Sequence, residues 1–206
     1  MEHKFILILG DKKTSSWSLR AWLVLKHTGV PFNEEIIKLG TPNTKLEILK
    51  YSPSGKVPVL QHGETLIWES LSIAEYLNEL FPESKLWPME EEARAFARSV
   101  SSEMHAGFTN LRKLMPFALN EPKKMPISTE LDQEITRIEE IWQECRLKYA
   151  KSGDYLFNDF SIADAMFAPV VLRFKAYNYK PKNPLVARYC ETILENSLIK
   201  EWILNS

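Results

Sequence analysis

Two serines directly after a short apolar run could support chemistry on a bound thiol. The run spans residues 5–9, and Ser15 and Ser16 lie where a helix is expected to begin. A helix start presents unpaired backbone N–H groups and a partial positive charge, and a serine hydroxyl can donate one more hydrogen bond. Together these would lower the pKa of a thiol from about 8.5 by roughly one to three units, which favours the nucleophilic thiolate. Capping of the helix by Thr14, Ser15 or Ser16 is the simpler interpretation, because serine is a preferred cap in any helix.

A proline at the start of an expected strand is a second unusual feature. Pro58 follows Val57 there, although proline donates no hydrogen bond and weakens a ladder. A cis bond between them would turn the N–H and C=O of Val57 outward, where they could pair with an extended peptide. The alternative is an ordinary trans proline at a strand edge, because only about one X-Pro bond in twenty is cis in folded proteins.

Glu69 and Ser70 form a second helix start with an acid and a hydroxyl. Ser70 is expected to cap the helix, and a capped helix start also binds a carboxylate. Glu69 could take an ammonium group. One amino acid carries both charges, so the three motifs in this order predict a site for a small thiol peptide.

The segments around these motifs predict a small mixed α/β unit. A strand over residues 4–9, a helix over 16–27 and a strand over 32–37 should form a right-handed crossover with parallel strands. Further along we expect a short helix over residues 44–50, an antiparallel hairpin of strands over 57–61 and 65–68, and a helix over 70–80.

Strand signals disappear in the second part of the chain. Residues 81–88 contain two prolines and no periodicity, which predicts a linker between a domain over 1–80 and an all-helical domain over 89–206. Long helices are expected over residues 90–119 and 129–151, and shorter ones over 184–194 and 198–204.

A capping-box-like pair, Ser161 and Asp164, opens one more helix in this second part. The apolar run over 165–172 is nearly continuous, which predicts that this helix lies at the centre of a bundle.

Composition points to an ordinary globular protein. The chain has 206 residues, 45% of them apolar and 26% charged, with a net charge of −1. This balance gives no electrostatic reason to expect nucleic acid or an anionic membrane as a partner. We find no signal peptide and no apolar run of about 18 residues, and therefore expect a cytoplasmic protein.

Neither cysteine nor histidine forms a metal-binding pattern. Cys145 and Cys190 lie far apart and are expected to be buried and reduced. The four histidines show no metal-ligand spacing, so no metal is expected.

The chain resembles the cytosolic glutathione transferases over essentially its full length. The matching runs are residues 15–20, 52–60, 69–77 and 160–164, and the double serine is most similar to the zeta class, which includes maleylacetoacetate isomerases, and to its bacterial relatives. The resemblance implies a thioredoxin-like domain over 1–80 that binds glutathione, an all-helical domain over 89–206 with an electrophile pocket, and a symmetric homodimer. It also implies that the capping box has a structural role.

The resemblance assigns roles around the thiol of glutathione. It makes Ser15 the hydroxyl that stabilises the thiolate, with Ser16 as the close alternative. It makes Val57 the backbone partner of the cysteinyl unit, before a cis Pro58.

The same resemblance assigns the two ends of the tripeptide. Glu69 and Ser70 would hold the γ-glutamyl amino and carboxylate groups, and Lys45 or Lys56 could reach the glycyl carboxylate.

The electrophile site departs from the zeta pattern. Trp17 stands where that class typically has cysteine, and its bulk would narrow the site. Zeta members use an arginine after the capping box for an acidic substrate, and Arg173 is the nearest candidate, with Lys175 and Arg112 as other possibilities. Arg173 could equally form an interdomain ion pair. Side chains that could line the pocket, or equally belong to the core, are Phe108, Leu111, Met115 and Phe117.

Three functions are compatible with this sequence to different degrees. The first is a detoxifying transferase that adds glutathione to small electrophiles, or a glutathione-dependent cis-trans isomerase of the maleylacetoacetate type. The second is a non-catalytic module for protein interaction on the same architecture. The third, a thiol reductase, is disfavoured because no cysteine precedes Cys145.

Overall fold

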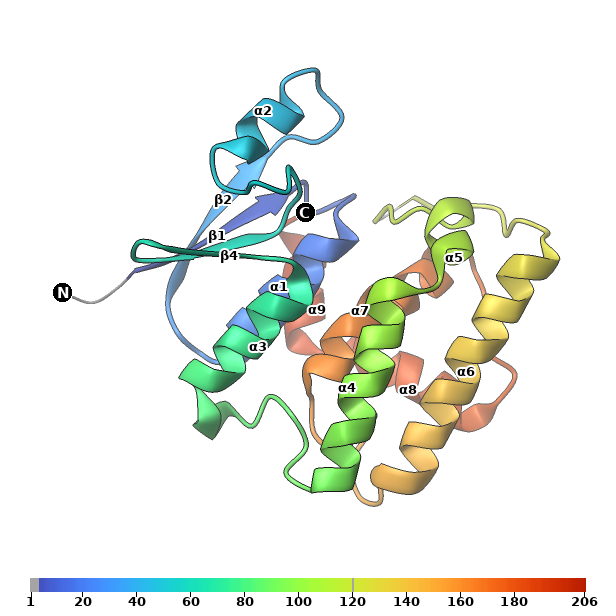
Figure 1. Ribbon diagram of the computed structural model, residues 1–206. Coiled ribbons are helices and arrows are strands. Elements are labelled where there is room, and N and C mark those ends of the chain that lie inside the picture. The colour runs from blue at the N-terminus through green and yellow to red at the C-terminus, as the bar shows by residue number, and fades with distance from the viewer. Residues whose placement is uncertain (1–3, 120) are drawn as a thin grey trace.

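The computed structural model describes residues 4–119 and 121–206 and places a small sheet beside a group of helices (Figure 1). The sheet has the order β2-β1-β3-β4, in which β1 pairs parallel with β2 and antiparallel with β3. This arrangement confirms the predicted crossover and hairpin. The elements of this part are β1 (Phe5–Gly10), α1 (Ser16–His27), β2 (Phe32–Ile37), α2 (Thr44–Leu49), β3 (Val59–His62), β4 (Thr65–Trp68) and α3 (Ser70–Leu80).

Alternation along β1 gives the sheet two buried faces. Leu7 and Leu9 belong to the main core with α1 and α3, whereas Ile8 joins a smaller cluster with Ile48 of α2. Successive side chains of a strand point to opposite faces, so a continuous apolar strand needs a cover on each side. Helix α1 covers one of these faces, and its first residues therefore lie close to the end of β1.

Strand β3 begins at Val59, so the prediction that it starts at Val57 was wrong by two residues. The reason is local, because Pro58 has no N–H to donate to the ladder. Val57 and Pro58 therefore lie in the loop before the strand.

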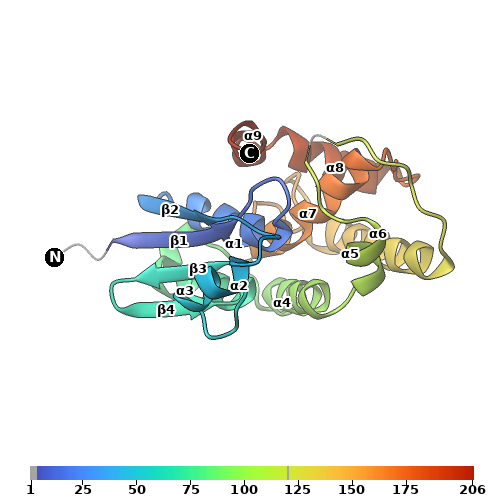
Figure 2. The same ribbon diagram turned by 90° about the horizontal axis from the view of Figure 1, so that it is seen from above.

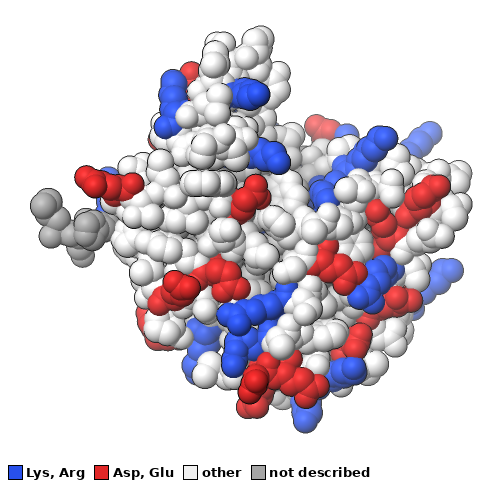
Figure 3. Space-filling model, in the orientation of Figure 1, with Lys and Arg blue, Asp and Glu red and all other residues white. Residues whose placement is uncertain are grey.

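The second part of the chain is helical. Its elements are a 3₁₀ turn, η1 (Pro82–Ser84), and the helices α4 (Glu91–Ala106), α5 (Thr109–Leu114), α6 (Thr129–Tyr149), α7 (Ile162–Ala176), α8 (Pro184–Glu195) and α9 (Ser197–Leu204). Acidic and basic side chains are interspersed over the face shown in Figure 3. Within the described residues, no helix is long and apolar enough to cross a membrane.

The prediction of one helix over residues 90–119 was wrong. Helix α4 ends at Ala106, with Gly107 as its cap, and Phe108 takes a left-handed backbone conformation with φ of 58°. A second helix, α5, then ends before Met115. Apolar spacing continued across the break, which is why periodicity alone did not reveal it.

Helix α7 lies at the centre of the fold, as its apolar run predicted. Every residue from Ile162 to Phe174 is buried, and the helix packs on α1, α4 and α8 (Figure 2). Helix α9 returns to the sheet side, where Trp202 donates to the carbonyl of Lys12 at 3.1 Å. The two parts of the chain therefore share one continuous core.

The capping box at the start of α7 is buried. The Asp164 carboxylate accepts hydrogen bonds from the N–H and hydroxyl of Ser161, both at 2.9 Å, and from the N–H of Leu156 at 3.0 Å. Burial raises the pKa of Asp164 to about 6 against these hydrogen bonds.

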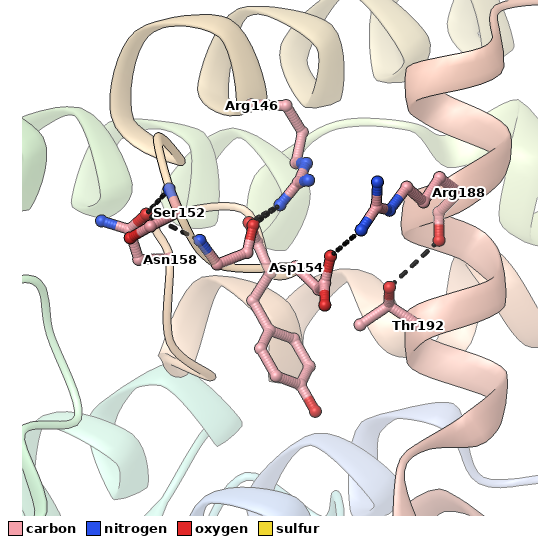
Figure 4. A network of polar contacts seen from close by, with 8 residues as sticks. Arg146, Ser152, Asp154, Asn158, Arg188 and Thr192 are labelled. Atoms are coloured by element: carbon pink, nitrogen blue, oxygen red, sulfur yellow. Dashed lines mark hydrogen bonds and ion pairs between the residues drawn. The ribbon is translucent and has the colours of Figure 1, made fainter.

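A polar network fixes the loop before the capping box (Figure 4). Arg146 of α6 donates to the carbonyls of Gly153 and Tyr155 at 2.7 and 2.6 Å, and Arg188 of α8 pairs with Asp154 at 2.8 Å. Gly153 is required there, because a Cβ would lie 2.0 Å from the carbonyl oxygen of Asn158.

The segment over residues 81–88 is packed against both parts. Ile162 donates to the carbonyl of Leu86 at 2.9 Å, and the Trp87 indole donates to the Glu75 carboxylate at 3.2 Å. The division into domains over 1–80 and 89–206 stays a prediction.

Candidate active site

Ser15 caps helix α1. Its hydroxyl oxygen accepts the N–H of Ser18 at 3.3 Å and its proton goes to the Ser18 hydroxyl at 2.8 Å. Ser18 in turn accepts the N–H of Gly10, at the end of β1, at 2.9 Å. The capping interpretation is therefore confirmed, and the hydroxyl lies at the positive end of the helix dipole. A ligand thiolate would have to accept the hydrogen bond that the Ser15 hydroxyl now donates to Ser18.

Ser16 has a different partner, Arg173 of α7. The guanidinium donates to the Ser16 hydroxyl at 3.3 Å, to the carbonyl of Met115 at 2.8 Å and to the carbonyl of Pro169 at 3.2 Å. Burial, followed by the charge of Arg112, lowers the pKa of Arg173 to about 10. Arg173 thus lies beside the double serine, held by hydrogen bonds to neutral oxygens, and its guanidinium forms no ion pair within residues 4–119 and 121–206.

Trp17 lies against two further guanidinium groups. Those of Arg20 and Arg112 stand 4.2 and 5.4 Å from its ring centre. Arg20 donates from Nε to the carbonyl of Met166, but its two terminal nitrogens are buried and have no partner among the described residues. Burial, then Arg173 and Arg112, lower the pKa of Arg20. Three arginines, Arg20, Arg112 and Arg173, therefore gather near the α1 start, and we call them the arginine cluster.

Arg20 was not singled out from the sequence. The available signal is an arginine four residues after Ser16, inside the apolar stretch of the helix, a spacing that places both residues on one face.

A cavity of about 290 Å³ brings together four of the five predicted glutathione-binding residues, whereas Lys45, Ser15 and Ser16 are not among its lining residues. Its lining residues are Trp17, Lys56, Val57, Pro58, Glu69, Ser70 and His105. The Val57-Pro58 bond is cis, as the resemblance implied. A larger cavity of about 860 Å³ lies elsewhere, between the segment after η1 and the end of α6.

Glu69 and Ser70 both have features that a ligand would explain. The prediction that Ser70 caps α3 was wrong, because Glu69 occupies the cap position and Ser70 is the first helical residue. The Ser70 hydroxyl is buried with no partner in the described part of the chain, and Glu69 has a φ of 69°. An unpaired buried hydroxyl and a left-handed non-glycine residue each cost free energy, and such features concentrate at binding sites.

The two lysine candidates lie near the same loop. Lys56 is exposed at the cavity, and the Lys45 side chain on α2 packs beside Gly55. Either amino group could extend toward the open end of the cavity.

His105 is a site residue that the sequence did not indicate. It lies on α4, with Nε2 at 3.5 Å from the Glu69 carboxylate and its ring edge-on to Trp17 at 5.2 Å between centres. Glu69 and His105 are far apart in the chain and share no motif, so only the packing of α4 beside α3 reveals the pair.

The other electrophile-site candidates are core residues. Phe108, Leu111, Met115 and Phe117 are all buried, and Met115 contributes its carbonyl to Arg173. Lys175 is exposed near the end of α7. Among the described residues, no group of three or more His, Cys, Asp or Glu side chains is placed to hold a metal ion.

Comparison with known proteins identifies relatives for most of the chain. The family model for the glutathione S-transferase N-terminal domain matches residues 14–80. Maleylacetoacetate isomerase of Rattus norvegicus is 31% identical over 172 residues, which cover 80% of this chain and 76% of that protein. A probable maleylacetoacetate isomerase of Caenorhabditis elegans is 28% identical over 190 residues, 89% of this chain and 86% of the relative.

Solved structures share the fold over nearly the whole length. A glutathione transferase homologue from Burkholderia, determined with bound glutathione, superposes with a TM-score of 0.72 at 23% identity and covers 98% of this chain and 97% of its own. At this identity the likeness establishes the architecture, a thioredoxin-like domain followed by a helical domain.

Proposed function

Because this chain belongs to the glutathione S-transferase family, we propose that it binds glutathione in the 290 Å³ cavity and activates its thiol with Ser15 for attack on an electrophile. The observation that carries the proposal is the unpaired, buried Ser70 hydroxyl beside the left-handed Glu69, in one cavity with the cis Val57-Pro58 bond. The unpaired hydroxyl and the left-handed backbone of Glu69 each cost free energy, which a bound ligand would compensate.

Each end of glutathione has a partner of matching chemistry. Ser70, at the start of α3, donates to the γ-glutamyl carboxylate together with the helix N–H groups, and Glu69 accepts from the ammonium. Val57 lies outside the β ladder, so its backbone can pair with the cysteinyl unit. Lys45 or Lys56 binds the glycyl carboxylate.

Ser15 is the better candidate for the thiolate. It stands at the helix cap, at the positive end of the dipole, although its hydroxyl must turn away from Ser18 to donate to a ligand. Ser16 stays the close alternative, because accepting from Arg173 leaves its own proton available to donate. One charge-assisted hydrogen bond of about 1.5–3 kcal/mol, together with a dipole contribution of about 0.3–1 kcal/mol, would ionise a substantial fraction of the bound thiol at pH 7.

The arginine cluster favours an electrophile that carries a carboxylate. Arg20 has two buried terminal nitrogens that find no hydrogen-bond partner in the described part of the chain, and burial, Arg173 and Arg112, in that order, lower its pKa. This observation supports a second candidate function, glutathione-dependent isomerisation of an acidic maleyl-type substrate. The Rattus norvegicus relative, a maleylacetoacetate isomerase, has a name that agrees with this function. Trp17 would limit the bulk of either kind of electrophile.

We propose a homodimer in the cytoplasm with a role in detoxification. Leu66 and Trp68 of edge strand β4, and Leu80 of α3, are large apolar side chains with 38–39% exposure, which a second copy could cover. Light scattering that gives the mass of a single chain would contradict the dimer. A non-catalytic module is disfavoured, because it would have no need of Ser15, Glu69 and Ser70 together.

Turnover of Ser15→Ala and Ser16→Ala tests the role of the hydroxyl, with a haloarene, an epoxide and a maleyl compound as electrophiles. Losing one charge-assisted hydrogen bond should reduce the kcat of Ser15→Ala by about 10- to 150-fold and leave the glutathione KM nearly unchanged. Undiminished turnover in both variants would contradict the hydroxyl mechanism.

Isothermal titration separates the enzyme from a non-catalytic module. We expect heat of binding from the wild-type protein at millimolar glutathione. The absence of any binding would refute the proposed site.

A further inference from the structure

His105 occupies the wall of the cavity next to Glu69. Its Nε2 lies 3.5 Å from the Glu69 carboxylate, and both side chains line the same space as Ser70. The Trp17 indole packs edge-on against the imidazole, with 5.2 Å between the two ring centres. The carboxylate proposed to receive the ammonium group therefore already faces a second nitrogen donor.

The surroundings of the imidazole indicate which form it takes. Its Nδ1 is buried and has no hydrogen-bond partner among the described residues. A second proton there would create a buried N–H without an acceptor, whereas a lone proton on Nε2 points to Glu69.

The charged groups around His105 act in both directions. Burial lowers its pKa from 6.5 most strongly, Glu69 raises it, and the positive charges of Arg20, Arg112 and Lys56 lower it. The imidazole is thus neutral at pH 7 and can gain a proton in mildly acidic solution.

We propose that His105 is a positioning residue for glutathione: its neutral imidazole orients the Glu69 carboxylate toward the γ-glutamyl ammonium, and its protonated form competes with that ammonium. The proposal rests on the proposed function, because it needs glutathione in this cavity. It adds a proton-linked selectivity for peptides with a free γ-glutamyl amino group.

The sign of the linkage follows from the charges. Bound ammonium next to Glu69 disfavours a second positive charge on His105, so binding at acidic pH must release a proton. Affinity should be constant above pH 7 and should fall by up to about tenfold for each pH unit below the pKa of His105.

The experiment is isothermal titration of glutathione into the protein between pH 5 and 7.5, in two buffers with different ionisation heats. We expect proton release and a progressively weaker Kd toward pH 5 in the wild type. His105→Gln should keep its affinity at pH 7.5, because the amide can donate from a similar position, and should lose the pH dependence. His105→Ala should bind more weakly at every pH.

A glutathione analogue without the γ-glutamyl amino group is the matched ligand control. It should bind the wild type more weakly and without proton release. These wild-type measurements decide the question even if a His105 variant fails to fold.

The possible failures are distinguishable. If glutathione binds but the wild type and His105→Gln share one pH profile, or if the analogue shows the same proton release, the role of His105 is wrong and the proposed function stands. If no ligand binds at any pH, both are wrong.

Discussion

Replacement of Asp164 by alanine should destabilise the protein more than the loss of an ordinary helix cap. The carboxylate is fully buried and accepts three hydrogen bonds, from the N–H of Leu156 and from the N–H and hydroxyl of Ser161. Each donor left unpaired costs about 1–3 kcal/mol, so the three together would cost about 3–9 kcal/mol, and water admitted to the vacated space would bring the loss toward the lower part of this range. We therefore expect Asp164→Ala to lower the free energy of unfolding by about 3–5 kcal/mol.

Urea denaturation followed by circular dichroism measures this cost. With a slope of about 2 kcal/mol per molar, a loss of about 4 kcal/mol moves the midpoint by about 2 M. The control is Ser128→Ala at the half-exposed start of α6, where the hydroxyl accepts one N–H, from Leu131, at 3.3 Å. That variant should lose only about 1 kcal/mol. If both variants unfold at the same midpoint, the buried network does not stabilise α7 as argued.

Three further expectations concern single side chains. Cys145 and Cys190 are buried, and burial raises the pKa of both thiols, to about 12 for Cys190. A thiol reagent such as DTNB should therefore react with neither cysteine until urea unfolds the chain. Rapid labelling of the native protein would contradict this expectation. Burial lowers the pKa of His27, so protonation of its imidazole favours the unfolded state. The wild type should therefore lose stability relative to His27→Gln as the pH falls from 7 to 5. Urea midpoints of the two proteins that change equally over this range would count against it. Trp17→Ala should raise turnover of bulky electrophiles relative to small ones, and an unchanged ratio in the kinetic screen would place the electrophile elsewhere.

Local signals predicted the strands, the parallel crossover and the antiparallel hairpin well, whereas the pairing of β3 with β1, which sets the order of the sheet, was not predicted. The expected strand over residues 4–9, helix over 16–27 and hairpin strands over 57–61 and 65–68 all rest on local patterns, and the structure follows them to within two residues. The central place of α7 followed from an apolar run too continuous for a surface helix.

The errors arose where local pattern and packing disagree. Apolar periodicity ran across Gly107, so the break between α4 and α5 was invisible. Ser70 was assigned as a cap by residue type, but Glu69 takes that position with an unusual φ.

The site was only partly accessible from the sequence. The motifs around Ser15, Val57 and Glu69 share one fold unit, so their grouping could be expected. Contacts such as Arg173 to Ser16 and His105 to Glu69 join distant segments, and no spacing rule describes them.

Ultraviolet titration of the glutathione thiolate on the protein tests the central claim most directly. Bound glutathione should show the thiolate absorbance at a pH roughly one to three units below that of the free tripeptide, whose thiol pKa is about 8.5. Ser15→Ala should return the transition toward the free value while still binding the ligand. A bound thiol that ionises at the same pH as free glutathione in the wild-type protein would contradict the account.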